Sequence, residues 1–187
     1  MKIYKKKIQI GVIGSAGWEE YPGKKPNRKL YKLAYEVGKL IALKQAILIC
    51  GGKGGIMMEV CRGAKENNGI TVGVVSGNKR NTANTYVDIE VVSGFSNYAE
   101  EGIIVSMSDG LIAIGGGAGT LQEIATAYRN KKTIVAIQNS GGWAKITAGT
   151  YLDERKTVKI YATSSPNEAV RILIKKIKSK KCDTICI

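Results

Sequence analysis

Residues 110–123 read GLIAIGGGAGTLQE, and this stretch decides the fold. Its first five residues form an apolar run that is typical of a buried strand, and four glycines follow within five residues. Glycine has no Cβ, so such a turn lets a ligand approach the backbone, and the N–H groups of a following helix suit a phosphate. We therefore predict a phosphate-binding loop, with a tight strand-to-helix turn as the simpler alternative. Its residues are Gly115, Gly116, Gly117, Gly119 and Thr120.

Glu123 lies one turn into the helix that this loop begins. At that distance its carboxylate would reach the group to which the phosphate is attached. It could stabilise developing positive charge or position a water molecule, so Glu123 is a candidate catalytic residue. The alternative is a first-turn glutamate that only complements the helix dipole.

Short apolar runs alternate with amphipathic segments along the rest of the chain. We predict strands at residues 8–14, 46–50, 70–75, 110–114, 133–137 and 158–161, with a short one at 86–92. The predicted helices span residues 27–44, 56–68, 97–107, 118–130 and 166–177. Continuous apolar strands between helices indicate a parallel sheet that is covered on both faces. The fold class is therefore α/β, a single-domain Rossmann-like, doubly wound and mostly parallel sheet over residues 1–178, with residues 179–187 as a tail.

Two further glycine loops follow predicted strands. Gly14 and Ser15 begin the first, and the second contains Gly51, Gly52, Gly54 and Gly55, with Met57 just after it. In an open parallel sheet all loops after the carboxyl ends of strands lie on one edge, and ligands bind where the strand order reverses. We therefore predict one crevice, between strands 8–14 and 110–114, for a phosphorylated small molecule. None of the loops matches G-x-G-x-x-G or G-x-x-x-x-G-K-[ST], which disfavours NAD binding and Walker-type NTP hydrolysis.

Composition indicates one basic domain. The chain has 187 residues and a formal net charge of +14, and such a surface attracts anions, including nucleic acid. Only 6% of the residues are aromatic, too few for a surface on which bases stack, so a generally basic, solvated surface is the alternative. No apolar run reaches about 18 residues and no signal peptide is visible, so we expect a cytoplasmic protein with no membrane partner.

The cysteines do not suggest a metal site. Histidine is absent, no C-x-x-C occurs, and Cys50 and Cys61 fall in a predicted strand and helix. We therefore predict no metal site, no required cofactor, and free thiols. A disulfide between Cys182 and Cys186, three residues apart near the end of the chain, is left open.

Three segments resemble the LONELY GUY, or lysine-decarboxylase-like, family of the SLOG superfamily. Residues 116–123 resemble its P-G-G-x-G-T-x-x-E motif with Gly115 in place of the proline, and residues 51–57 resemble its G-G-x-x-G-x-M loop. Residues 77–94 are more similar to the branch that holds the molybdenum cofactor carrier proteins and their uncharacterised prokaryotic relatives. The resemblance implies that Gly116, Gly117, Gly119 and Thr120 hold a phosphate. It also implies that Glu123 acts at the ribose of a nucleoside 5′-monophosphate.

Positions 100 and 101 depart from the family pattern. The family places an Arg-Lys pair on the helix before the central strand, and an ungapped count back from Asp109 puts Glu100 and Glu101 there. Reversed charge near an anionic substrate favours binding without chemistry, although the two glutamates could simply form a solvated helix turn.

Three hypotheses remain. The first is a binding protein for a phosphorylated ligand, either an AMP-like nucleotide or a molybdopterin-type cofactor, similar to molybdenum cofactor carriers. The second is a nucleoside 5′-monophosphate phosphoribohydrolase of the cytokinin-activating type. The third, from a distant similarity to the fold of DNA-processing protein A, is a single-stranded nucleic-acid binder. The family resemblance also implies a homo-oligomer, a dimer or tetramer.

Overall fold

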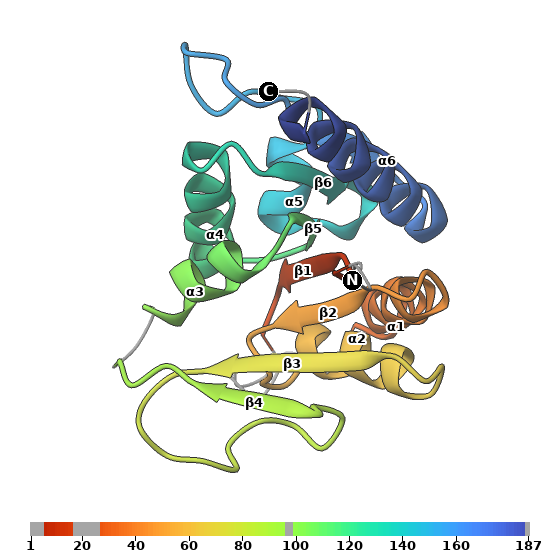
Figure 1. Ribbon diagram of the computed structural model, residues 1–187, viewed down its shortest axis with the longest axis vertical. Helices are drawn as coiled ribbons and strands as arrows, with labels where there is room; N and C mark the ends of the chain where they lie inside the picture. Colours follow the sequence, from red (N-terminus) through yellow and green to blue (C-terminus); the bar gives the residue numbers. More distant parts are fainter. Residues whose placement is uncertain (1–5, 17–26, 96–98, 186–187) are drawn as a thin grey trace.

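The computed structural model describes residues 6–16, 27–95 and 99–185, which form an α/β fold around one parallel sheet (Figure 1). The described strands lie in the order β4-β3-β2-β1-β5-β6-β7, and every neighbouring pair is parallel. Their bounds are β1 Gln9–Gly14, β2 Ile47–Cys50, β3 Ile70–Val75, β4 Ile89–Val92, β5 Gly110–Ile114, β6 Thr133–Ile137 and β7 Tyr161–Thr163. The predicted doubly wound, Rossmann-like sheet is confirmed, and it is entirely parallel in the described strands.

Helices cover both faces of the sheet. Those described are α1 Arg28–Leu43, α2 Ile56–Lys65, α3 Glu100–Met107, α4 Ala118–Arg129, α5 Gly142–Thr147 and α6 Pro166–Ile185, with a short 3-10 helix η2 Gln138–Ser140. Successive strand residues point to opposite faces, so Ile112 packs with α1, α2 and α6 whereas Leu111 packs with α3, α4 and α5. Two separate apolar cores therefore hold the two helical layers on the sheet.

Helices α1 and α2 cross closely on their face of the sheet. Asn27 caps α1, because its side-chain oxygen accepts the N–H of Leu30 at 3.1 Å, as its position in the sequence predicts. A Cβ on Gly38 would lie 1.9 Å from the carbonyl oxygen of Val60. The absence of that atom lets the two helix backbones touch.

Some predicted boundaries are wrong. Strand β7 begins at Tyr161 rather than at residue 158, because Ile160 bonds with the loop at Gly149 and Thr150 instead of with β6. Strand β4 begins at Ile89 rather than at residue 86. Helix α6 continues to Ile185, so residues 179–185 are helical and not the expected tail. The apolar periodicity ends at residue 177, but lysine is a good helix former and prolongs the helix.

Candidate ligand-binding site

A cavity of about 300 Å³ lies at the carboxyl ends of β1, β2 and β5. Strand β1 pairs with β2 on one side and with β5 on the other, so the predicted neighbours at the switch point are confirmed. Of the residues predicted for the site, the cavity is lined by Gly14, Gly51, Met57, Gly117, Gly119, Thr120 and Glu123. The others lie outside its lining, namely Ser15, Gly52, Gly54, Gly55, Gly115 and Gly116.

Gly115 and Gly116 use their polar groups inside the protein. The hydroxyl oxygens of Ser140 and Ser15 accept the N–H groups of Gly115 and Gly116 at 2.7 and 2.9 Å. Their carbonyl oxygens accept N–H groups from the first turn of α5, at 2.9 and 3.0 Å. Both glycines have positive φ, which suits residues without a Cβ. The anion-binding capacity of this loop therefore lies in the next residues along the chain.

The first turn of α4 faces the cavity. Gly117 is its N-cap residue, and Gly117, Ala118, Gly119 and Thr120 all line the cavity. The first N–H groups of a helix have no acceptor within the helix and carry the positive end of its dipole. This turn is therefore suited to an anion such as a phosphate.

Three glutamates lie in the same cavity. Glu100 and Glu101 come from the start of α3 and Glu123 from α4, and all three are 8% exposed. The expectation that Glu100 and Glu101 form a solvated helix turn is wrong, because α3 packs against the first turn of α4 and buries both side chains. Lys53 is the only basic residue in the lining as far as the structure describes the chain, and its Nζ lies 3.9 Å from Oε1 of Glu100.

Burial and mutual repulsion raise the pKa values of two of these carboxyl groups. Burial, followed by the charge of Glu100, raises the pKa of Glu101 to about 7, although Lys53 opposes the shift. Burial, followed by the charges of Glu101, Cys50 and Glu100, raises the pKa of Glu123 well above its ordinary value. The raised pKa favours the protonated form of Glu123, which can donate a hydrogen bond to a ligand.

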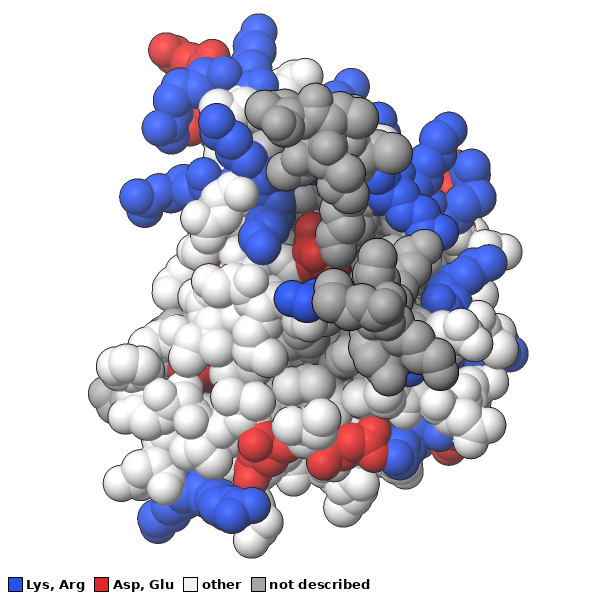
Figure 2. Space-filling view, viewed as in Figure 1, with Lys and Arg blue, Asp and Glu red and all other residues white. Residues whose placement is uncertain are grey.

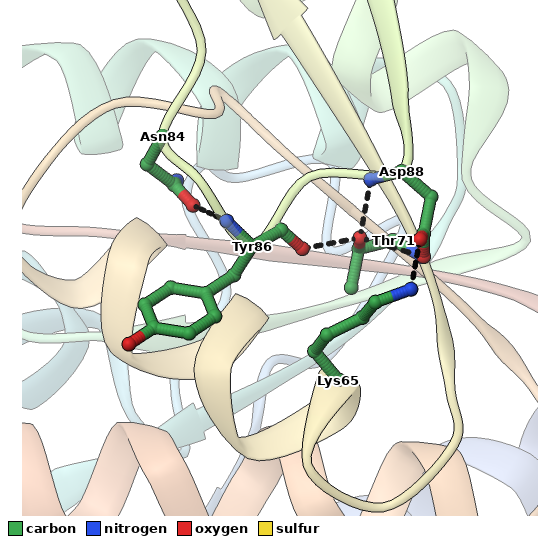
Figure 3. Close-up of polar contacts among 5 residues, drawn as sticks. All are labelled: Lys65, Thr71, Asn84, Tyr86 and Asp88. Carbon is green, nitrogen blue, oxygen red and sulfur yellow. Dashed lines mark hydrogen bonds and ion pairs between the residues drawn. The ribbon is translucent and has the colours of Figure 1, made fainter.

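Asn84 holds the second glycine loop, which carries Lys53. The Asn84 side-chain amide donates to the carbonyl oxygens of Gly52 and Lys53, each at 2.9 Å, and its backbone N–H donates to Gly52 at 2.7 Å. The Asn84 side-chain oxygen accepts the N–H of Tyr86 at 3.1 Å (Figure 3). These contacts fix the backbone from which Lys53 reaches the cavity.

The segment after Asn84 is anchored to β3 in turn. The Thr71 hydroxyl donates to the carbonyl oxygen of Tyr86 at 2.6 Å and accepts the N–H of Asp88 at 2.8 Å. Lys65 forms an ion pair with Asp88 (Figure 3). Residues 84–88 therefore connect the loop after β2 to the sheet edge. The sequence predicts residues 86–88 as the start of a strand, whereas they form this anchor and β4 begins at Ile89.

Cys50 and Cys61 are buried free thiols, as predicted. Their sulfur atoms lie 3.4 Å apart, and the N–H of Gly52 points to the Cys50 sulfur at 3.4 Å. The possible disulfide between Cys182 and Cys186 involves side chains outside the described residues.

The outer surface is basic. Figure 2 shows Lys and Arg side chains at the upper left and upper right of the viewed face, and α6 lies at the upper right in Figure 1. Lysines 175, 176, 178 and 180 lie on this helix. In the described part of the chain, no helix combines the length and the apolar character that a membrane span requires.

Comparisons with known proteins agree with this architecture. The model of the SLOG cluster4 family matches residues 7–170. An uncharacterised protein of Archaeoglobus fulgidus is 38% identical over 133 residues, which are 71% of this chain and 82% of that protein. The molybdenum cofactor binding protein of Rippkaea orientalis has a TM-score of 0.75 at 32% identity, and 93% of this chain matches 99% of that one. The molybdenum cofactor carrier protein of Chlamydomonas reinhardtii has a TM-score of 0.72 at 28% identity, over 93% and 99% of the two chains.

Proposed function

Because this chain belongs to the SLOG cluster4 family, we propose that it binds a phosphorylated pterin or nucleotide without transforming it, as a carrier of the molybdenum cofactor type. The observation that carries the proposal is the cavity in which the first turn of α4 faces Lys53 across the edge of the sheet. The two solved structures with molybdenum cofactor names match this chain over almost their whole length, which supports a molybdopterin-type ligand.

Two sets of lining residues suit two different parts of the ligand. The N–H groups of Gly117, Gly119 and Thr120 face the phosphate, and the Thr120 hydroxyl adds a donor. Apolar side chains of Val12, Met57 and Ile104 provide a surface for a flat heterocycle. Glu123, in the protonated form that its raised pKa favours, can donate to a ring nitrogen or carbonyl oxygen of that heterocycle.

The hydrolase alternative is less favoured by this cavity. The raised pKa of Glu123 favours its protonated form, which cannot accept a proton from an attacking water. Glu100 and Glu101 also stand where the resemblance to the hydrolase family would place an Arg-Lys pair. Binding of single-stranded nucleic acid has only the basic outer surface in its favour. The proposal also includes a homo-oligomeric state and a cytoplasmic location, as expected from the sequence.

Mass spectrometry of the small molecule that co-purifies with the protein tests the proposal directly. We expect a phosphorylated pterin or a nucleoside monophosphate in a ratio near one per chain. AMP should raise the thermal midpoint of the protein. Incubation with AMP at high protein concentration, followed by chromatography, should show no release of adenine. Adenine release that disappears in Glu123→Gln would establish the hydrolase instead. A steep, salt-sensitive retardation of single strands would favour the nucleic-acid alternative.

A further inference from the structure

We propose that the cavity takes its phosphorylated ligand together with one hard divalent cation, Mg²⁺ or Mn²⁺, held between Glu100, Glu101 and the ligand's phosphate. This inference rests on the proposed function, because the phosphate supplies part of the coordination. It departs from the sequence-based prediction of no metal site, which considered only histidine and cysteine ligands.

Two buried oxygen atoms lack partners. Oε2 of Glu100 and Oε2 of Glu101 are inaccessible to solvent and accept no hydrogen bond from any described residue. Both side chains line the cavity and are about nine-tenths buried. A buried acceptor without a donor is costly, and a buried carboxylate is normally paired or bound to a metal. These two oxygen atoms therefore point to a positively charged group that completes the site.

The charge of the cavity supports the same conclusion. Among the described residues that line the cavity, Lys53 is the one cationic side chain; its side chain is 46% exposed and it already lies near Glu100. A phosphate ester would bring further negative charge into a space with little water, where repulsion is weakly screened. An additional cation removes this repulsion.

The carboxylates lie next to the proposed phosphate position. A Cβ built on Gly119 would lie 2.7 Å from Oε1 of Glu101. Gly119 belongs to the first turn of α4, whose N–H groups suit the phosphate. A cation bound by Glu101 would therefore lie within reach of phosphate oxygen atoms.

The donor set identifies the kind of cation. Magnesium is usually bound through one or two carboxylates, substrate phosphates and several waters, rather than by an all-protein cage. Among the described residues, no group of three His, Cys, Asp or Glu side chains is arranged to hold a metal. The cavity lining contains no cysteine, and the chain contains no histidine. An oxygen-only site completed by a ligand phosphate fits Mg²⁺ or Mn²⁺ and not zinc.

The test measures Mn²⁺ binding by electron paramagnetic resonance of the free ion, with AMP and then inorganic phosphate as the phosphate probes. We expect weak binding of Mn²⁺ alone and at least tenfold tighter binding in the presence of AMP, after correction for the Mn²⁺–AMP complex without protein. By thermodynamic reciprocity Mn²⁺ must tighten AMP binding by the same factor, which calorimetry measures. The double variant Glu100→Gln/Glu101→Gln should lose this coupling. Glu36→Gln, which removes an exposed carboxylate outside the cavity, should keep it.

The outcomes separate the two proposals. Equal AMP affinity in EDTA and in Mn²⁺ would overturn the cation site and leave the binding function standing. Mn²⁺ binding that the double variant abolishes, without binding of either phosphate probe, would support the carboxylate site and count against the proposed function. Unchanged coupling in the double variant, whose fold is checked by circular dichroism, would also overturn the inference.

Discussion

Replacing Glu101 by glutamine tests the electrostatics of the cavity. The pKa of Glu101 is raised from 4.5 to about 7 in the folded protein by burial and by Glu100. Since one pKa unit corresponds to about 1.4 kcal/mol, ionising this group costs the folded state at most about 3.5 kcal/mol. Because the folded pKa is the higher one, the associated stability is fully present below pH 4.5 and is lost as the pH rises through about 7.

Glutamine keeps the shape of the side chain and does not titrate. We therefore expect Glu101→Gln to be more stable than the wild type by about 1–3 kcal/mol at pH 8 and by less than about 1 kcal/mol at pH 5. Urea unfolding followed by circular dichroism in EDTA at pH 5, 6, 7 and 8 measures this difference. The control Glu36→Gln, at an exposed glutamate, should show no such pH dependence. A gain of the same size at both pH values, or a loss at pH 8, would refute the reasoning.

Three further predictions concern the loops. Gly119→Val should lower AMP affinity at least tenfold by calorimetry with little change in thermal midpoint, since the added Cβ meets the carboxylate end of the Glu101 side chain and no backbone atom; unchanged affinity would show that the phosphate binds elsewhere. Ser15→Ala should lower the free energy of unfolding by about 1–3 kcal/mol, because it leaves the Gly116 N–H unpaired, whereas the exposed Ser106→Ala should change it little. Asn84→Ala should weaken AMP binding and speed hydrogen exchange in residues 51–55, and protection equal to wild type would contradict its role as an anchor.

The fold was largely predictable because its signals are local. Apolar runs and glycine turns fix the strands, and the rule for parallel sheets then places β1 beside β5. The burial of Glu100 and Glu101 was not predictable, because it depends on where α3 packs against α4. Ser140 carries no sequence signal either, since its hydroxyl reaches Gly115 across 25 positions of the chain. The position of the cavity at one edge of the sheet can be predicted from the topology, whereas the charge of its lining depends on tertiary packing.

The serine contacts of Gly115 and Gly116 have a consequence for the kinetics of ligand exchange. Ser15 holds this loop from one side and Ser140 from the other, before any ligand arrives. The backbone therefore loses little conformational entropy when a ligand binds. Ordering of the loop does not limit the rate of association. For the same reason, opening of this loop is a poor route for release. On the proposed carrier function, a recipient protein would have to compete for the exposed parts of the ligand.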